Sequence, residues 1–330
     1  MEKILIIGAG RWGSALGVYL QKKGFQVAML CHSLSTQNQI RQKKTSPHLP
    51  NFPFQEGVQA FLNWDGQQFS PDLLLLCTPS KFLEETLASL PKFPKTLPIM
   101  GVNKGIGTST LQTIPEMVKK KFPENPYLHL GGPCFPPGLL EEKSFVAETL
   151  ACEDLNLASV WQKKISSPTF RIYISQDVLG VALLGAVKNI FAIASGALKA
   201  IHANEEAYSI LITRGLHEIS QLKHFYPIQD ATIYGLSGLG DLVLTCYSPS
   251  SSHNVHFGEL VVQLGGAEQA VAAMGNSVAE GYTTTKALHQ KIQNTGVQMP
   301  IMEAIYRFLY ENQPIYELLQ SLMQRPLKKE

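Results

Sequence analysis

Residues 3–13 of the chain read KILIIGAGRWG, and this stretch decides the fold. The apolar run Lys3–Gly8 has the composition of a buried β-strand, and it leads into the pattern Gly8-x-Gly10-x-x-Gly13. In such a pattern the first glycine permits a tight turn and the second lets the backbone approach a pyrophosphate. The third lets the following helix pack closely on the strand, and the N-terminus of that helix offers amide donors to phosphate. The stretch therefore predicts a dinucleotide site.

The first half of the chain repeats this alternation of strand and helix. Helices are expected over Trp12–Lys23 and from about Pro79–Lys81. Further strand-like segments are Gln26–Cys31, Asp72–Thr78, Pro98–Val102 and Tyr127–Gly131, with Phe145–Ala151 and Phe170–Ile174 as additions at an edge. Buried strands that alternate with helices are typical of βαβ units and a parallel sheet. The sequence thus predicts an α/β domain over residues 1–176, built as a Rossmann-type doubly wound sheet.

From Asp177 onward the pattern is helical, and little in it resembles a strand. The expected helices are Asp177–Ile201, Glu205–Phe225, Gly258–Leu264, Gly281–Gln293 and Pro300–Glu311, and residues 248–252 (SPSSS) are expected to form a loop. We therefore predict an all-α C-terminal domain over residues 177–330. Its longest apolar stretch, Val178–Ala194, approaches the length of a membrane span. Lys188 and Asn189 in the middle of that stretch favour a buried helix of a soluble domain.

Composition limits the class of protein. The 330 residues include 28 Lys and Arg against 26 Asp and Glu, and a net charge of +2 gives no reason to expect a nucleic-acid or membrane partner. Charged residues make up 16% of the chain, against about 25% in typical soluble proteins, which favours a large core, an oligomer interface or a deep cleft. The five cysteines are scattered, without a Cys-x-x-Cys pair, so we expect a reducing cytoplasm and no disulfide framework.

The choice between the two nicotinamide dinucleotides depends on a residue about 20 positions beyond the glycines, where an acid usually holds the ribose. Here that place reads Cys31-His32-Ser33, and no acid occurs over Lys3–Gln55. A carboxylate would repel a 2′-phosphate, so its absence is compatible with NADP. Arg41, Lys43 or Lys44 offers charge to that phosphate, although such bases are equally typical of a solvated face. The sequence favours NADP(H) over NAD(H) without excluding the latter.

Lys188 is the most informative residue of the second half. It shares one face of an otherwise apolar helix with Gly180 and Leu184, and Asn189 follows it. Burial lowers the pKa of a lysine, which can then exchange a proton near neutral pH. A lysine near a helix end can instead extend its ammonium group to solvent. On this segment alone both interpretations stay open.

Several short motifs follow one another in a fixed order along the chain. After GAGRWGSAL at residues 8–16 come NKGI (103–106), GPCF (132–135), KN (188–189), LITRGL (211–216), GLGDLVLTC (238–246), EG (280–281) and RPLK (325–328). This ordered set resembles the bacterial NAD(P)-dependent glycerol-3-phosphate dehydrogenases over essentially the whole chain. The resemblance implies an oxidoreductase that transfers a hydride reversibly between NAD(P)H and dihydroxyacetone phosphate. The product, sn-glycerol 3-phosphate, serves phospholipid synthesis.

The resemblance also implies roles for individual residues. Lys188 is expected to be the general acid and base for the C2 oxygen, and Lys104 to polarise that oxygen and hold the substrate. Asp241 and Thr245 are expected to complete the polar network around the catalytic lysine. Further substrate contacts are implied for Gly132, Cys134, Ser252, His253 and Asn254. The implied cofactor contacts are Gly8, Gly10, Arg11, Trp12, Gly13, Lys104, Pro136, His253, Val278 and Glu280.

The chain departs from the family pattern at three places in the substrate site. The family's Ser-Arg-Asn triplet reads Ser252-His253-Asn254 here, so the arginine that grips the phosphate is missing. Loss of a charge-assisted pair weakens binding by about 1.5–3 kcal/mol, and a histidine is mostly neutral above pH 7. Cys134 replaces a serine, and Pro136-Pro137 replace Ala-Glu. His253 and His256 have a spacing that permits a metal, but without an evident third ligand we expect none.

The leading interpretation is a working glycerol-3-phosphate dehydrogenase of the cytoplasm with a weakened or rebuilt phosphate grip. One alternative is a related dehydrogenase for another small hydroxy or keto substrate, which the missing arginine motivates. Another is an NAD(P)-binding sensor without turnover, which the presence of Lys104, Lys188 and Asp241 opposes. The expected partner is a small phosphorylated substrate, with no nucleic acid and no integral membrane segment. The apolar helices of the second half are compatible with a homodimer.

Overall fold

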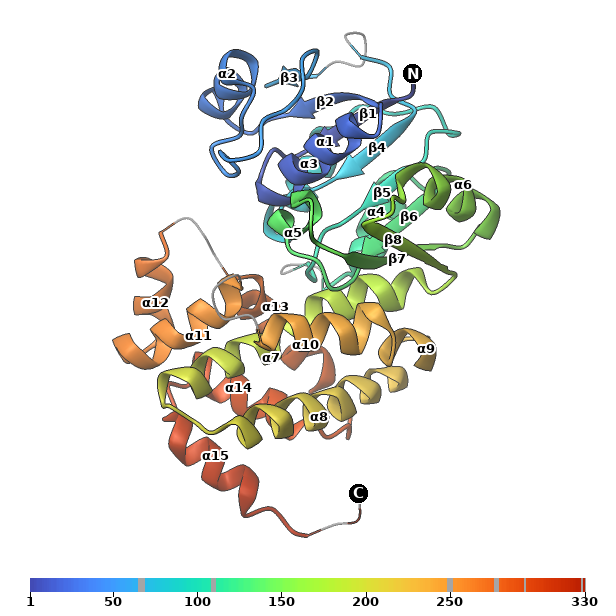
Figure 1. Cartoon of the computed structure of the whole chain (residues 1–330). Coiled ribbons are helices and arrows are strands. Elements are labelled where there is room, and N and C mark those ends of the chain that lie inside the picture. The colour runs from blue at the N-terminus through green and yellow to red at the C-terminus, as the bar shows by residue number, and fades with distance from the viewer. Residues whose placement is uncertain are drawn as a thin grey trace. The chain divides into compact units, whose positions relative to one another are not determined.

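The computed structural model describes residues 1–64, 69–107, 111–247, 252–275, 279–293, 295–327 and 329. The chain folds into two compact units (Figure 1). The first contains Met1–Gly107 and Gln112–Ala182, and the second contains Leu183–Glu330. Helix α7 (Val178–Ala200) belongs to both, so no single residue separates them. The boundary after Gln176 stays a prediction.

An eight-stranded sheet forms the centre of the first unit, in the order β3-β2-β1-β4-β5-β6-β7-β8. The strands are β1 Lys3–Ile7, β2 Gln26–Leu30, β3 Gln59–Phe61, β4 Leu73–Leu76, β5 Ile99–Gly101, β6 Tyr127–Gly131, β7 Val146–Cys152 and β8 Phe170–Ser175. Neighbouring strands pair in parallel except β6 and β7, which are antiparallel. The strand order reverses at β1, as in dinucleotide-binding sheets, and ligands bind at the carboxyl ends of the strands beside such a reversal. The predicted doubly wound α/β fold is confirmed.

Helices cover both faces of this sheet (Figure 1). They are α1 Arg11–Lys22, α2 Leu34–Lys43, α3 Leu83–Ser89 after the short helix η1 Ser80–Phe82, α4 Ile114–Lys121, α5 Pro136–Leu140 and α6 Leu155–Ile165. The side chains of β1 alternate between two apolar layers. Ile4 and Ile6 pack in the layer that contains residues of α1 and α6, and Leu5 and Ile7 pack in the layer with α3 and α4. Burial on both faces explains why the central strands are continuous apolar runs.

The second unit is built from helices, and no strand occurs among those of its residues that the structure describes. Besides α7, they are α8 Glu205–Gln221, η2 Leu222–His224, α9 Asp230–Ile233, the π-helical turn η3 Leu236–Gly240, α10 Asp241–Tyr247, α11 His253–Leu264, α12 Ala267–Ala273, α13 Glu280–Ile292, α14 Pro300–Tyr310 and α15 Ile315–Met323. By length and composition α7 is apolar enough to cross a membrane, but 89% of its most apolar window is buried in this protein. It is a core helix, and the predicted helical domain is confirmed.

Two local predictions differ from the structure. Helix α11 begins at His253, so the expected start at Gly258 is wrong. The reason is a cap, because the hydroxyl of Ser252 accepts a hydrogen bond from the N–H of Val255 at 3.3 Å. Residues 248–251 of the expected loop lie outside the described part of the chain. Helix α15 had not been predicted, although Pro314 before it and the apolar spacing within it are helix signals.

Candidate active site

The glycine loop follows β1 directly and leads into α1. Gly8 has a φ of +105°, and a Cβ there would lie 3.0 Å from the carbonyl carbon of Cys77. A Cβ at Gly13 would collide with the carbonyl oxygen of Gly8. At Gly10, the N-cap of α1, a Cβ would meet nothing within 4 Å, and the first turn of the helix contains no acidic residue. The loop is therefore packed against protein at Gly8 and Gly13 and open at Gly10, which fits the approach of a pyrophosphate.

Three further residues of this unit that the sequence predicts as cofactor contacts lie on or against helix α1. Arg11 and Trp12 form the first turn of α1, with Arg11 exposed and Trp12 packed against the apolar layer on that face. Pro136 begins α5, and α5 packs against α1. The fold thus brings Pro136 to the helix that starts at the glycine loop, although they are far apart in sequence.

A basic side chain lies at the end of β2, where dinucleotide-binding proteins often have an acid. Burial raises the pKa of the Cys31 thiol, directly after β2, to about 11, and the positive charge of Arg41 partly offsets this rise. Arg41, on α2, donates from Nε to the carbonyl of Ala60 on β3 at 2.8 Å. By contrast, the ammonium of Lys44 lies 3.6 Å from the carboxylate of Glu56. Arg41 therefore acts on Cys31 at the end of β2, whereas Lys44 is paired with Glu56.

Lys104 lies in the segment that follows β5, close to a buried histidine of β6. Burial and the charge of Lys104 lower the pKa of His129 to about 3, so this imidazole is neutral at physiological pH. Its Nδ1 atom is 2.8 Å from the hydroxyl of Tyr127. Sequence reasoning missed both side chains, although a histidine inside an apolar strand is a signal of a specific partner.

Gly132 and Cys134 follow β6 in the same unit. Gly132 has a φ of +152°, and a Cβ there would lie 3.0 Å from the Cα of Glu148 on β7, so glycine is required. The N–H of Cys134 donates to the carbonyl of Gly132 at 2.9 Å, and its thiol contacts the carbonyl of Phe135 at 3.5 Å. These contacts hold the turn in a defined conformation, with the thiol directed at its own backbone.

Lys188, Asp241 and Thr245 meet in the interior of the second unit. The side chain of Lys188 is 4% exposed and that of Asp241 is 1% exposed. The Nζ atom of Lys188 donates to Oδ1 of Asp241 and, at 2.6 Å, to the hydroxyl of Thr245. That hydroxyl donates in turn to the backbone carbonyl of Asp241 at 2.7 Å. The two interpretations of Lys188 are thereby resolved, because it is a buried, paired cation and not a lysine that extends to solvent.

The residues beside this pair are buried. Burial raises the pKa of the neighbouring Cys246 thiol to about 12, with the charge of Lys188 lowering it and that of Asp241 raising it. The backbone carbonyl oxygen of Asn189, the next residue on α7, lies close to Gly281 at the start of α13. A Cβ at Gly281 would collide with that oxygen, so only glycine permits this contact. The Oδ1 atom of Asn254 on α11 accepts a hydrogen bond from the N–H of Gly281 at 2.9 Å. Helices α7, α11 and α13 therefore converge beside Lys188.

The remaining predicted residues lie at the starts of α11 and α13. Ser252 is buried as the cap of α11, whereas His253 and His256 are exposed on that helix. Glu280 is the first residue of α13. Val278 lies outside the described residues. Lys104 and Gly132 belong to the first unit, and the Lys188 network and these helix ends belong to the second.

Comparison with known proteins identifies the family. The N-terminal model of the NAD-dependent glycerol-3-phosphate dehydrogenases matches residues 3–158, and the C-terminal model matches residues 177–320. The chain belongs to this family. Two bacterial relatives named glycerol-3-phosphate dehydrogenase (NAD(P)+) are similar over 100% of this chain and 99% of their own length. They come from Geobacter sp. (strain M21), at 35% identity, and Limosilactobacillus fermentum, at 33%.

Solved structures of glycerol-3-phosphate dehydrogenases share the fold. The crystal structure of the enzyme from Coxiella burnetii has a TM-score of 0.89 and 28% identity, with 98% of this chain and 99% of that chain covered. A structure from Plasmodium falciparum has a TM-score of 0.88 at 20% identity, which shows the fold alone. The resemblance that the ordered motifs indicated is confirmed over the full length of the chain.

Proposed function

We propose that this chain is an NAD(P)-dependent sn-glycerol-3-phosphate dehydrogenase that reversibly reduces dihydroxyacetone phosphate to sn-glycerol 3-phosphate for phospholipid synthesis. The observation that carries the proposal is the buried network of Lys188, Asp241 and Thr245 in a chain of this family. Burial of two charges is costly even when they are paired. A sensor that binds the cofactor without turnover has no need of such a pair.

The proposed chemistry places one acid and base at the substrate's C2 oxygen. When bound, the nicotinamide supplies or accepts the hydride at C2. Lys188 gives a proton from Nζ to the C2 oxygen during reduction and takes it back during oxidation. Asp241 and Thr245 hold the Nζ atom in place, and the carboxylate stabilises the ammonium form. Lys104 polarises the same oxygen and stabilises the negative charge that develops on it.

The substrate phosphate is held in this proposal by groups at the start of α11 and by the turn after β6. Ser252, His253 and Asn254 stand at the positions of the family triplet, and Gly132 contributes a backbone donor beside Cys134. A histidine in place of arginine offers fewer donors and no permanent charge, so we expect a weaker phosphate grip. A related dehydrogenase for another small hydroxy or keto substrate is the second candidate, and this replacement is what favours it.

The dinucleotide is proposed to bind along the open side of the loop at Gly10, with Arg11, Trp12, Pro136 and Glu280 among its contacts and Val278 as a further candidate. We propose that NADP(H) is preferred over NAD(H). Support comes from Arg41, whose charge acts on Cys31 at the end of β2. A guanidinium at that place offers a charge-assisted hydrogen bond to a 2′-phosphate.

The reaction itself is tested with purified protein, dihydroxyacetone phosphate and either NADPH or NADH, by following the absorbance of the reduced nicotinamide. We expect oxidation of the nicotinamide on addition of the ketone, and a panel of other phosphorylated and unphosphorylated ketones tests the second candidate. Lys188→Met should abolish turnover and leave the affinity for the cofactor unchanged. If the unaltered protein binds the cofactor but does not oxidise it when dihydroxyacetone phosphate is added, the proposal is wrong.

Cofactor preference is tested separately by kcat/KM with the two nucleotides. Arg41→Ala should lower the ratio of NADPH to NADH efficiency by about tenfold, the loss of one charge-assisted hydrogen bond. Lys44→Ala is the matched control, because Lys44 is on the same segment but beside Glu56, and it should leave the ratio unchanged. Equal ratios in all three proteins would refute the role of Arg41.

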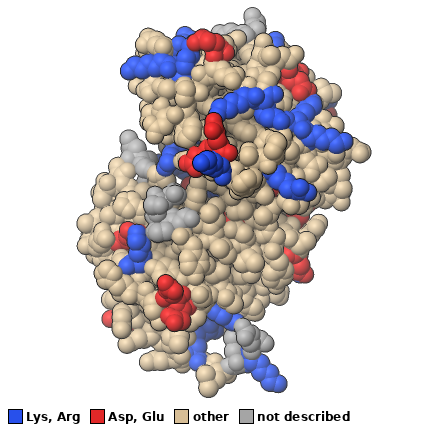
Figure 2. Space-filling view, in the orientation of Figure 1, with Lys and Arg blue, Asp and Glu red and all other residues tan. Residues whose placement is uncertain are grey.

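A cytoplasmic location and a homodimer are the remaining parts of the proposal. The five cysteines are free thiols, which suits a reducing compartment. Most of the visible face of the helical unit carries neither Lys and Arg nor Asp and Glu (Figure 2), which suits contact with a second copy. Light scattering of the purified chain measures its mass, and a monomer at every concentration would refute the dimer.

A further inference from the structure

The second unit contains a cavity of about 660 Å³ that the proposed reaction does not use. It is lined by α8, α14, α15 and the tail after α15, with Ala194 and Leu198 of α7 contributing as well. Lys188, Asp241 and Thr245 are not among its lining residues. Its volume falls within the roughly 300–1,000 Å³ that is typical of small-molecule sites.

The inner wall of the cavity is apolar. Leu211 of α8, Ile305 and Phe308 of α14 and Leu318 of α15 line it, and all four side chains are buried. A cavity with such a lining gives a water molecule few hydrogen-bond partners, whereas an alkyl chain makes dispersion contacts with every wall. This apolar part of the lining therefore fits a hydrocarbon chain.

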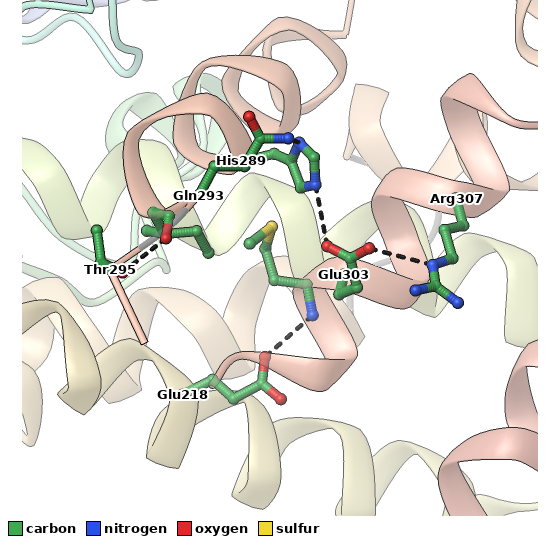
Figure 3. A network of polar contacts seen from close by, with 8 residues as sticks. Glu218, His289, Gln293, Thr295, Glu303 and Arg307 are labelled. Atoms are coloured by element: carbon green, nitrogen blue, oxygen red, sulfur yellow. Dashed lines mark hydrogen bonds and ion pairs between the residues drawn. The ribbon is translucent and has the colours of Figure 1, made fainter. Parts of the chain in front are cut away.

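A buried carboxylate fixes one corner of this cavity. The carboxylate oxygens of Glu218 accept hydrogen bonds from the N–H groups of Ile301, at 2.7 Å, and Met302, at 3.0 Å, in the first turn of α14. Figure 3 shows the Glu218 carboxylate and one of these two contacts. Burial raises the pKa of Glu218 to about 7, while these two hydrogen bonds and the charges of Arg325 and Arg214 lower it. Glu218 thus supplies hydrogen-bond acceptors for two backbone N–H groups in the first turn of α14, and these bonds fix the part of the cavity wall that α14 forms.

Positive charge gathers at the rim of the cavity. Arg214 of α8, Arg325 and Lys329 line it, and the latter two are exposed in the tail that follows α15. Besides Glu218, the lining contains the exposed carboxylate of Glu206 at the start of α8. Apart from the corner at Glu218, the inner wall is therefore apolar, and three cations against one exposed carboxylate line the opening, where water is present to solvate a charged group.

We propose that this cavity binds an anionic amphiphile, a molecule with one alkyl chain and a phosphate or carboxylate head. The chain lies between Leu211 and Phe308, and the head lies at Arg325 and Lys329. Charge complementarity favours this occupant over a second copy of the chain, because a copy would bring the same positive rim against itself. The site lies outside the Lys188 network, so it does not depend on the proposed reaction.

The test uses the full chain and two series of probes, alkyl phosphates and alkyl carboxylates of eight, ten and twelve carbons, below their micelle concentrations. Isothermal titration calorimetry should show saturable binding that tightens about tenfold for every two added carbons, the effect of burying two methylene groups. Dodecyltrimethylammonium, with the same chain and a positive head, should bind at least about threefold more weakly. The two head groups show whether phosphate or carboxylate is preferred.

Two kinds of variant locate the site. Ala304→Phe, on the cavity wall of α14, should abolish binding, and Leu319→Trp on α15 serves the same purpose if the first variant does not fold. Arg325→Gln should weaken binding of the anionic probes by about threefold and strengthen that of the cationic probe, because it removes one positive charge from the rim. The matched control is Arg307→Gln. Arg307 is on α14 but outside the lining, and Glu303 accepts from its Nε at 3.1 Å (Figure 3).

The results that overturn the proposal are equally definite. The amphiphile does not enter this cavity if its affinity is the same for every chain length. The same conclusion follows if folded Ala304→Phe and Leu319→Trp variants still bind it with unchanged affinity. Light scattering during the titration tests the other occupant. If the probe lowers the mass of the protein in step with its binding, the cavity is covered by a second copy and the proposal is wrong.

Discussion

Replacement of Asp241 by alanine is expected to lower the free energy of unfolding by about 3–5 kcal/mol, the usual cost of breaking a buried ion pair from one side. The side chains of Lys188 and Asp241 are 4% and 1% exposed, so the ammonium that remains is a buried charge without its counter-ion. The hydroxyl of Thr245, at 2.6 Å from Nζ, keeps one acceptor for it, which places the expected loss near the lower limit of that range.

The chain supplies a matched control on its surface. Lys223 and Asp230 form a pair with an N–O distance of 2.7 Å, but their side chains are 42% and 61% exposed. Asp230→Ala should therefore cost less than about 1 kcal/mol. The same two residue types form both pairs, and the pairs differ most in burial, so the comparison tests burial as the cause.

Urea unfolding followed by circular dichroism measures both variants, with kcat and cofactor affinity determined on the folded protein. The double variant Lys188→Met, Asp241→Leu removes both charges, and it should recover most of the stability while staying inactive. If Asp241→Ala costs no more than Asp230→Ala, or if the double variant is as unstable as the single one, the buried pair is not what the geometry indicates.

Three further predictions concern the glycine loop, the carboxylate at α14 and the phosphate grip. Gly10→Ala should leave the stability unchanged and weaken cofactor binding at least about tenfold, because the added Cβ meets no protein atom within 4 Å but fills the approach to the pyrophosphate. Gly13→Ala should also lower the stability, because its Cβ collides with the carbonyl oxygen of Gly8. Thermal unfolding and nucleotide titration separate the two outcomes, and equal stability in both variants would contradict the packing argument. Because burial raises the pKa of Glu218 from 4.5 to about 7, the folded state holds its proton more tightly, so the stability that this group contributes is greatest below about pH 4.5 and should fall by about 3 kcal/mol as the pH rises through 7. Glu218→Gln should flatten that slope in urea titrations at several pH values, and an unchanged slope would assign it to other groups. His253→Arg should lower KM for dihydroxyacetone phosphate by about tenfold with little change in kcat, as measured by steady-state kinetics, and an unchanged KM would show that the phosphate is held elsewhere.

The sequence alone was sufficient where a pattern is local. The strand, turn and helix at residues 3–13 follow from the apolar run and the glycine spacing, since the clash that excludes a Cβ at Gly13 comes from Gly8 in the same loop. The helical character of the second half follows in the same way from the periodicity of its apolar residues. Boundaries were less certain, as the start of α11 shows, because one hydroxyl of Ser252 decides where that helix begins.

The environment of each polar side chain, by contrast, depends on how the whole chain folds. Lys188 could be either a snorkelling or a buried lysine until Asp241, 53 residues further along the chain, was placed against it. The same holds for Arg41 beside Cys31, for the neutral His129 near Lys104, and for the apolar cavity that α8, α14 and α15 enclose. Turn geometry and helical periodicity depend on neighbours in sequence. Burial and pKa depend on whatever packs around a group, and those neighbours come from distant parts of the chain.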